Sequence, residues 1–230
     1  MIKKLLNKLN FYGRFQIKFF NYYINRIKEV NHKKIKFSIF IPNKLCEYRV
    51  ETFSTKEPET LEWIDSMKPN SILFDVGANI GLYSIYAAKK NIKVIAFEPS
   101  VFNLEFLTKN IYHNNLKDII DIFPLPLSNF TNKNSMKYSS AVWGGALSTF
   151  GENKNWNGEK MVSEFEHSTF SITLDKFIDI YNLQYPDYIK IDVDGIEHLI
   201  ISAGQQTLRN CKSILIEIND NYIEQKNNSE

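Results

Sequence analysis

Residues that stabilise small domains through disulfides or bound metals are scarce in this 230-residue chain. It has two cysteines, Cys46 and Cys211, which lie far apart and form neither a disulfide framework nor a metal-ligand spacing. The four histidines are scattered as well. So few cysteines are typical of a reducing compartment, and we expect a cytoplasmic protein.

Long apolar runs are also missing. No stretch reaches the roughly eighteen residues of a spanning helix, and no apolar segment with a small-residue cleavage site follows the basic start, so no secretory signal is indicated. Hydrophobic residues still make up 43% of the chain and aromatic residues 14%. That content is enough for a sizeable core and excludes a disordered polymer.

Acidic residues are nearly absent from residues 1–36, which contain ten Lys or Arg and one acid, Glu29. This segment therefore carries +9 and the rest of the chain −7, since the whole carries +2. Seven aromatic residues lie between positions 11 and 23. One interpretation is a helix that lies on an anionic membrane, at its inner face, or that contacts nucleic acid. The commoner one is a helix that packs its aromatics on the domain and leaves its lysines in water.

The first 56 residues are expected to form this basic helical segment and a hairpin, separate from a domain over residues 57–230. Apolar and polar residues alternate on both sides of a turn-like segment, residues 42–44. The alternation predicts a hairpin over residues 36–53. Its apolar positions are Ile35, Phe37, Ile39 and Ile41 before the turn, and Tyr48, Val50 and Thr52 after it.

Short apolar strands separated by helical stretches follow from residue 71 onward. This alternation predicts a mostly parallel sheet covered on both faces, a Rossmann-like α/β fold. Residues 128–172 lack such regularity and are expected to form a long functional loop. The predicted strands cover residues 71–75, 92–98, 118–123, 187–192 and 213–218, and the predicted helices include residues 58–64, 101–111 and 196–203.

A glycine-rich turn over residues 74–81 follows the first of these strands, with the sequence Phe-Asp-Val-Gly-Ala-Asn-Ile-Gly. Gly77 and Gly81 let the backbone turn tightly and approach a ligand closely, because no Cβ intervenes. The next helix then directs its free N–H groups at that ligand. Such turns are common, so the spacing has to decide the type of cofactor.

A dinucleotide fingerprint that starts at Gly77 requires glycines at positions 79 and 82, where this chain has Asn79 and Leu82. The observed pattern is an acid, Asp75, followed by glycines at 77 and 81. A carboxylate suits a positively charged ligand group, such as the amino group of a methionine moiety, and disfavours a pyrophosphate. The spacing therefore favours S-adenosylmethionine over NAD.

Glu98, followed by Pro99, ends the second strand. A carboxylate at this position accepts hydrogen bonds from both ribose hydroxyls, and each such bond contributes about 1.5–3 kcal/mol. It also repels a 2′-phosphate, which disfavours NADP. Asp75 and Glu98 each end an apolar strand, and together they are a more specific signal than either alone.

A third acidic group, Asp192, Asp194 and Glu197, follows the fourth strand. Carboxylates this close bind a cation, act as a base, or hold a polar substrate. The metal interpretation is disfavoured because no further ligand stands at a defined spacing. We expect Asp192 to be the catalytic base and Glu197 or Asp194 to orient the substrate. Glu217, after the fifth strand, is a weaker candidate for the same cleft.

Over residues 57–218 the sequence resembles the FkbM family of methyltransferases. That family usually has Glu where this chain has Asp194, which leaves the charge in place. The resemblance rests on the glycine-rich turn at 74–81, Phe97-Glu98-Pro99 with Asn103, Leu127-Ser128-Asn129, Leu174-Asp175 and residues 189–197.

The resemblance implies transfer of a methyl group from S-adenosylmethionine to a hydroxyl, commonly on a sugar, glycan or secondary metabolite. A small-molecule or glycan acceptor is therefore expected, and no nucleic acid. The resemblance also implies residue roles. Asp75, Gly77, Ala78, Asn79 and Gly81 would surround the methionine part, Glu98 and Pro99 would hold the ribose, Ser128 would lie beside the adenine, and Asp192 would face the methyl group.

Folds of this kind continue past the fifth strand with a helix and an antiparallel strand pair, whereas residues 219–230 form a polar tail. We therefore expect a C-terminally incomplete sheet whose fifth strand has an uncovered edge. Such an edge invites pairing, which predicts a homodimer.

Two other functions share part of this pattern. An NAD-dependent oxidoreductase has the same sheet and the same acid at Glu98, but a different glycine spacing. A non-catalytic S-adenosylmethionine-binding protein that docks to a membrane through residues 1–36 keeps the cofactor motif and tolerates the loss of Asp192. If the chain transfers methyl groups, the loop around Trp143 is expected to close over the acceptor.

Overall fold

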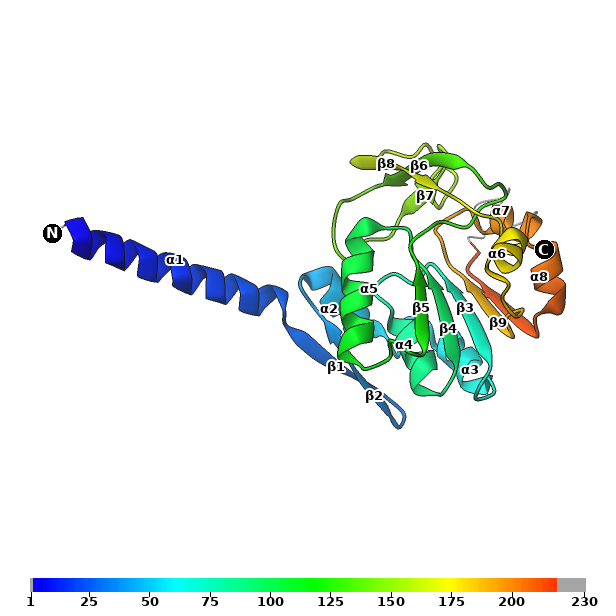
Figure 1. Ribbon diagram of the computed structural model, residues 1–230, viewed down its shortest axis with the longest axis horizontal. Helices are drawn as coiled ribbons and strands as arrows, with labels where there is room; N and C mark the ends of the chain where they lie inside the picture. Colours follow the sequence, from blue (N-terminus) through cyan, green and yellow to red (C-terminus); the bar gives the residue numbers. More distant parts are fainter. Residues whose placement is uncertain (1, 219–230) are drawn as a thin grey trace.

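The computed structural model describes residues 2–218, with side chains from residue 13 onward. The chain forms an α/β body from which one N-terminal helix extends (Figure 1). The helices are α1 (Ile2–Ile24), α2 (Lys44–Thr52), α3 (Pro58–Ser66), α4 (Leu82–Lys89), α5 (Val101–His113), α6 (Leu174–Tyr181), α7 (Glu197–Ser202) and α8 (Gln205–Asn210). The strands are β1 (Ile27–His32), β2 (Ile35–Phe40), β3 (Ile72–Val76), β4 (Lys93–Phe97), β5 (Ile120–Phe123), β6 (Lys133–Tyr138), β7 (Ser148–Phe150), β8 (Phe165–Phe170), β9 (Tyr188–Ile191) and β10 (Ser213–Ile216).

Five parallel strands form the central sheet, in the order β10-β9-β3-β4-β5. Successive side chains of β3 point to opposite faces, so Leu73 packs in a cluster with α4 and α5, and Phe74 in a second cluster with α6. All five predicted strands are present, and the Rossmann-like α/β class is confirmed. The strand order reverses between β3 and β9, where open parallel sheets bind ligands beyond the carboxyl ends of their strands.

The N-terminal hairpin lies earlier in the chain than expected. β1 and β2 pair antiparallel around the turn at residues 33–34. Residues 44–52 form the helix α2, so the predicted return strand was wrong. Asn43 caps α2 by accepting a hydrogen bond from the Cys46 amide at 2.8 Å. A side-chain cap of this kind stabilises a helix by about 1 kcal/mol, and here it favours the helix over a short alternating pattern.

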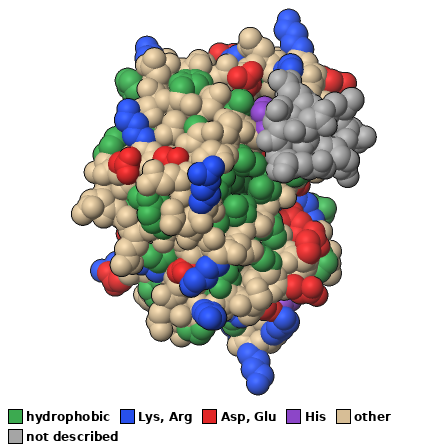
Figure 2. All heavy atoms as spheres, turned by 90° about the vertical axis from the view of Figure 1, so that its right-hand side faces the viewer, with side chains coloured by type: hydrophobic (Ala, Val, Ile, Leu, Met, Phe, Trp, Pro, Cys, Tyr) green, Lys and Arg blue, Asp and Glu red, His purple; other side chains and the backbone are tan. Residues whose placement is uncertain are grey.

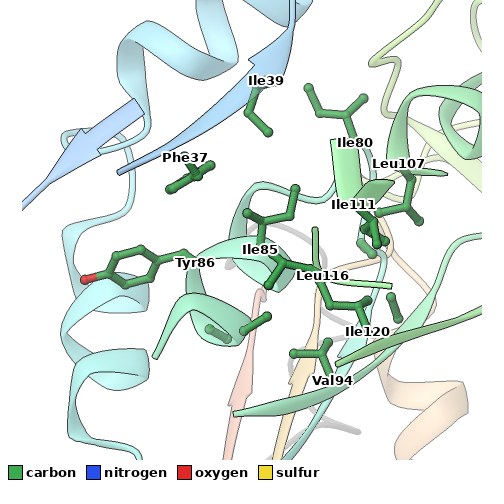
Figure 3. Close-up of a cluster of buried hydrophobic side chains, with 14 of the residues drawn as sticks. Phe37, Ile39, Ile80, Ile85, Tyr86, Val94, Leu107, Ile111, Leu116 and Ile120 are labelled. Carbon is green, nitrogen blue, oxygen red and sulfur yellow. The ribbon is translucent and has the colours of Figure 1, made fainter. Parts of the chain in front are cut away.

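β2 attaches the hairpin to the body (Figure 3). Phe37 and Ile39 are buried in one cluster with Tyr86 of α4. The Asn114 side chain of α5 donates to the Ser38 carbonyl at 2.7 Å and accepts from the Ser38 amide at 3.0 Å. The hairpin therefore shares its core with one face of the sheet.

Residues 128–172 contain a second sheet of three antiparallel strands, in the order β7-β6-β8. Met136 and Tyr138 of β6 are buried in a cluster with Phe150 and Ile196. The other residues of β6 are polar, and this composition hid the strand in the sequence. The prediction of an irregular loop was therefore wrong for these strands.

α1 extends away from the body (Figure 1). Phe15 and Phe19 are each 61% exposed, Phe20 is 60% exposed and Tyr22 is 73% exposed. The expectation that the N-terminal helix packs its aromatics on the domain was therefore wrong for residues 13–24. Within residues 2–218, no helix is long and apolar enough to cross a membrane.

β10 lies at one edge of the sheet and pairs with β9 in the described part of the chain. The predicted incomplete end falls on residues 219–230, outside the described residues. Both the uncovered edge and the homodimer therefore stay predictions. Figure 2 views the molecule from the side of α8 and shows hydrophobic side chains gathered near the middle of this face.

Candidate active site

Three loops meet where the strand order reverses, at the carboxyl ends of β3, β4 and β9. Backbone hydrogen bonds connect them. The Gly77 amide donates to the Phe97 carbonyl at 2.9 Å, and the Asp192 amide donates to the Val76 carbonyl at 3.0 Å. The predicted glycine-rich turn, Glu98 and the segment at 192–197 therefore lie along one edge of the sheet.

The two glycines of the first loop serve different contacts. Both have positive φ, +87° at Gly77 and +90° at Gly81. A Cβ on Gly77 would stand 1.8 Å from the carbonyl oxygen of Asp192, so this glycine lets the β3 and β9 loops touch. A Cβ on Gly81 would meet the tip of Leu107 at 2.6 Å, so that glycine lets α4 pack on α5.

Glu98 is a buried carboxylate held by backbone amides. It is 5% exposed and accepts hydrogen bonds from the amides of Asn79 at 2.6 Å and Ser100 at 2.8 Å. Burial outweighs these bonds and raises the pKa of Glu98 to about 7. The group is thus a fixed hydrogen-bond acceptor that titrates near neutral pH.

A pocket of about 530 Å³ surrounds Glu98 and is called the Glu98 pocket below. Thr149 Oγ1 on its wall is buried and has no hydrogen-bond partner among the described residues, so it is available to a ligand. Apolar side chains form much of the remaining wall, among them Phe97, Pro99, Leu125, Leu127, Met136 and Phe150.

A second pocket, of about 1,110 Å³, opens beside the first and is called the Glu217 pocket. It is rich in charge: Arg49, Lys56, Glu57 and Glu217 line it together with Trp156. Glu217 directly follows β10, and the other four residues lie outside the sequence motifs at the strand ends. The two pockets meet over the residues that line both, which are Gly77, Asn79, Ala146, Asp192 and Asp194.

Asp192 is paired with the buried cation of Lys190. The Lys190 side chain is 2% exposed, and its ammonium lies 2.5 Å from Asp192 Oδ2. Asp75 is in register with Lys190 on the neighbouring strand. Burial disfavours the charged form of Asp192, but the charge of Lys190 and the hydrogen bonds around Asp192 outweigh it and hold its pKa below the ordinary value. Asp192 is therefore ionised at neutral pH.

Glu217 lies beside Asp192 because β9 and β10 are neighbours. The Glu217 amide donates to the Ile191 carbonyl at 3.0 Å. A hydrogen bond with Asp192, and then the negative charge of Asp192, raise the pKa of Glu217 above its ordinary value. The pair thus holds one proton and one negative charge at neutral pH.

Asp194 and Glu197 shape the loop that follows Asp192. Asp194 has a φ of +61° and accepts a hydrogen bond from the Leu147 amide at 2.8 Å. Burial, and then the charge of Asp192, raise the pKa of Asp194 to about 6. Glu197 is 2% exposed, accepts from the amides of Val193 and Gly195, each at 3.0 Å, and lines neither pocket.

Several sequence-predicted residues lie away from both pockets. Asp75 is 1% exposed and accepts a hydrogen bond from the Ser84 hydroxyl. Ser128 is fully buried, while Leu125 to Leu127 line the Glu98 pocket in its place. Trp143 packs edge-on against Phe106, and residues 145–147 of its loop reach the pockets instead. Of the remaining predictions, Ala78 lines the Glu217 pocket and Pro99 the Glu98 pocket.

Some pocket residues carried no signal in the sequence. Arg49 lies on α2, Lys56 and Glu57 precede α3, and Trp156 lies within residues 128–172. None belongs to a motif, and all reach the site through tertiary packing. Among the described residues, no group of three or more His, Cys, Asp or Glu side chains is arranged to hold a metal ion.

Comparison with known proteins decides the family. The model of the methyltransferase FkbM domain matches residues 75–229, about two thirds of the chain. The chain belongs to the FkbM methyltransferase family. This assignment confirms the resemblance and removes the oxidoreductase alternative, because the matched family is one of methyltransferases.

Two curated relatives of this FkbM methyltransferase domain are methyltransferases by name. Methyltransferase sdnD of Sordaria araneosa is 26% identical over 58% of this chain and 60% of its own length. The hexuronic acid methyltransferase AglP of Haloferax volcanii is 24% identical over 67% of this chain and 59% of its own length. The chain thus spans about 60% of the length of these relatives.

Solved structures show more distant likenesses. A SAM-dependent methyltransferase from Agrobacterium tumefaciens has a TM-score of 0.47 and 10% identity, covering 88% of this chain and 56% of its own. A precorrin-6Y C5,15-methyltransferase from Geobacter metallireducens has a TM-score of 0.45 and 14% identity, covering 75% of this chain and 68% of its own. The family assignment rests on the domain match alone.

Proposed function

We propose that the chain is an S-adenosylmethionine-dependent methyltransferase that transfers a methyl group to a hydroxyl of a sugar, glycan or small metabolite. The observation that carries this proposal is the meeting of the two pockets at Asp192. A group-transfer enzyme has to bring a donor and an acceptor together at one point. Here the Glu98 pocket, with apolar side chains over much of its wall, adjoins a charged pocket, and the carboxylates of Asp192 and Asp194 line both.

The Glu98 pocket fits the nucleoside part of the cofactor. The Glu98 carboxylate would accept the ribose hydroxyls, as the sequence predicts for this strand end. The apolar wall suits a flat adenine ring, and the unpartnered Thr149 hydroxyl is available to a ring nitrogen. When bound, S-adenosylmethionine supplies an activated methyl group on a sulfonium centre.

The methionine part would lie near the junction of the pockets. Gly77, Asn79 and Asp194 line it there, and the carboxylates suit a ligand that is positively charged at both its sulfonium and its amino group. Asp75 does not contact this space, because it faces Ser84 and Lys190 behind the loop. We therefore assign Asp75 to the support of Lys190 rather than to the ligand.

Asp192 would take the proton from the acceptor hydroxyl. It is partly exposed at the junction, with 25% of its side chain accessible, and Lys190 keeps it ionised. A carboxylate with a lowered pKa is a weak base by itself. Its hydrogen-bond partner Glu217 has a raised pKa and carries the proton of the pair, so Glu217 supports the ionised form of Asp192 by donating a hydrogen bond to it.

The Glu217 pocket would hold the acceptor. Arg49 donates through Nε to the Gly144 carbonyl at 2.8 Å and lines the pocket, and Lys56 is paired with Glu57 at 2.6 Å. Donors and acceptors together with aromatic side chains, Phe53, Tyr83 and Trp156, suit a polyhydroxylated ring. AglP is named a hexuronic acid methyltransferase, which supports a sugar as acceptor.

The test is an assay with methyl-labelled S-adenosylmethionine and a panel of monosaccharides and short glycans, with and without a carboxyl group. We expect label in an acceptor, and Asp192→Asn should lower turnover about 100-fold or more, the usual range for a lost general base. Asp121→Asn is the matched control, because it makes the same change at an exposed residue of β5, and it should retain full turnover.

Asp192→Asn leaves the Lys190 cation buried without its partner, so its melting temperature has to be measured alongside. The double variant with Lys190→Met removes that penalty and should be as inactive as the single variant. Full turnover by a folded Asp192→Asn protein would contradict the base assignment. If the methyl label appears on a carboxyl group of the acceptor, and this transfer does not depend on Asp192, the reaction is ester formation and not hydroxyl methylation.

A further inference from the structure

α1 has two chemically different faces. Ile17, Phe20 and Ile24 recur at spacings of three and four, so they lie on one side of the helix. Lys18 lies on the opposite side together with Phe15 and Tyr22, at the same spacings, and Arg14 lies between the two sides. In the sequence, the same three-and-four spacing continues toward the start of the helix with Gly13, Leu9, Leu6 and Ile2.

The apolar face has no partner among the described residues. On this face Ile17 is 62% exposed and Phe20 60%, and α1 points away from the body in Figure 1. A row of exposed large apolar side chains of this kind marks a surface that another molecule covers.

The junction between α1 and the body is tied by several contacts. The Arg26 guanidinium stacks over the Tyr23 ring at 4.1 Å and donates to the Ile41 carbonyl at 3.3 Å. The Asn25 side chain donates to the Asn21 carbonyl at 2.8 Å. Because these bonds connect the end of α1 to β2, a surface bound by α1 would also orient the domain.

Charge identifies the partner. α1 carries five cations, Lys3, Lys4, Lys8, Arg14 and Lys18, and no acid. Two copies of such a helix repel each other, which disfavours α1 as a dimer contact. Nucleic acid would use the cations but would leave the broad apolar face in water. An anionic lipid surface satisfies both faces, because the apolar side enters the interface and the cations meet the headgroups.

We propose that α1 is an interfacial helix that docks the domain on an anionic lipid surface. It lies along the interface and does not span the membrane, in keeping with its length of 23 residues and its cationic face. The inference is independent of the methyl-transfer reaction.

The test is vesicle flotation with the full chain. Vesicles of phosphatidylcholine alone are compared with vesicles that also contain phosphatidylserine, at low and at high salt. We expect about tenfold or stronger binding to the anionic vesicles at low salt, and a large loss at high salt because the surface charge is screened.

Phe20→Glu and Phe15→Glu form a matched pair of variants. They make the same substitution at two exposed phenylalanines, but Phe20 lies on the apolar face and Phe15 on the opposite side. Phe20→Glu should weaken vesicle binding about tenfold or more, and Phe15→Glu less than about threefold. Both should keep the melting temperature of the parent, because Phe15 and Phe20 are exposed.

Four results would overturn the proposal. One is equal binding to neutral and anionic vesicles, and another is an equal loss in the two variants. The third is a dimer in sedimentation that Phe20→Glu dissociates, without vesicle binding by the parent, because the apolar face would then belong to a second copy. Binding of a DNA or RNA oligonucleotide with no vesicle binding would assign the cations to nucleic acid.

Discussion

The Glu98 pocket and the Glu217 pocket share an edge but differ in how they are built. The first has the buried carboxylate of Glu98 and apolar side chains over much of its wall, and it shares Asp192 and Asp194 with the second. The second gathers charges of both signs, including Arg49, Lys56 and Glu217. The first is formed mainly by the ends of central strands and the small antiparallel sheet, whereas the second also draws on α2, the segment before α3 and the end of β10.

This difference separates two tasks. Residues at the ends of adjacent parallel strands are held in place by the sheet itself, so a binding site made from them changes little with the loops around it. A site made from peripheral segments depends on how those segments pack. We infer that the Glu98 pocket serves the constant partner, the cofactor, and the Glu217 pocket the variable one, the acceptor.

The largest effect that tests this division is on cofactor affinity. Glu98→Ala removes two charge-assisted hydrogen bonds to the ribose, each contributing about 1.5–3 kcal/mol, so S-adenosylmethionine should bind about 100-fold more weakly or worse. Glu217→Ala, an equal truncation in the other pocket, should change that affinity less than about threefold. Calorimetric titration of both variants measures the difference.

Equal losses in the two variants would break the division between the pockets. Because Glu98 also holds the amides of Asn79 and Ser100, the thermal stability of Glu98→Ala has to be measured as well. Glu98→Gln, which keeps an acceptor oxygen, should lie between the parent and Glu98→Ala in affinity.

A smaller difference is expected between two alanine substitutions in the first loop. Gly77→Ala puts a Cβ against the backbone carbonyl of Asp192, which cannot move without separating β3 from β9. Gly81→Ala meets the tip of Leu107, a side chain that can turn aside. Each substitution should lower the free energy of unfolding by about 1–2 kcal/mol, because alanine is strained in the left-handed backbone. Overpacking should lower it by about 2 kcal/mol more in Gly77→Ala.

Chemical denaturation of both variants checks this expectation. Similar free energies of unfolding would mean that the contact between the β3 and β9 loops is looser than the structure shows. The junction of the two pockets would then be a poor place to align a donor with an acceptor.

The smallest effect is a pH dependence that belongs to the Glu98 pocket. The pKa of Glu98 is raised to about 7 by burial, and the ribose hydroxyls bind better to its ionised form. Affinity for S-adenosylmethionine should therefore increase about tenfold from pH 6 to pH 8. Glu98→Gln cannot titrate, so any pH dependence of affinity that this variant retains belongs to the ligand. If the affinity of the parent protein changes with pH no more than that of Glu98→Gln, the assignment is contradicted.

The raised pKa of Glu98 also makes the stability of the fold depend on pH, with a trend opposite to that of cofactor affinity. The folded protein binds a proton at Glu98 that the unfolded chain releases at the lower, ordinary pKa. The contribution of Glu98 to stability is therefore most favourable at acidic pH and declines as the pH rises through the interval up to about 7.

The sequence predicted the central sheet because its strands are buried on both faces and read as continuous apolar segments. Ser71 to Asp75 and Asp187 to Asp192 are examples. The sequence did not predict β6, because most of its residues are polar and only Met136 and Tyr138 are buried in a core. It failed again at α2, where a capping side chain, Asn43, decides between helix and strand.

The site was predictable to the extent that it consists of strand ends. Glu98 and Asp192 follow their strands directly, so periodicity was enough to place them together. Glu197 looked like a third site acid, yet it binds the amides of its own loop, a choice that spacing does not reveal. Arg49, Lys56 and Trp156 belong to no motif, and only the packing of distant segments brings them to the Glu217 pocket.

The most direct test of the account is a calorimetric titration of the full chain with S-adenosylmethionine, with NAD titrated in parallel. We predict a dissociation constant near micromolar for S-adenosylmethionine, about −8 kcal/mol, and no heat of binding for NAD. Absence of S-adenosylmethionine binding by a folded sample, or binding of NAD in its place, would contradict the central claim that the Glu98 pocket is the cofactor site of a methyltransferase.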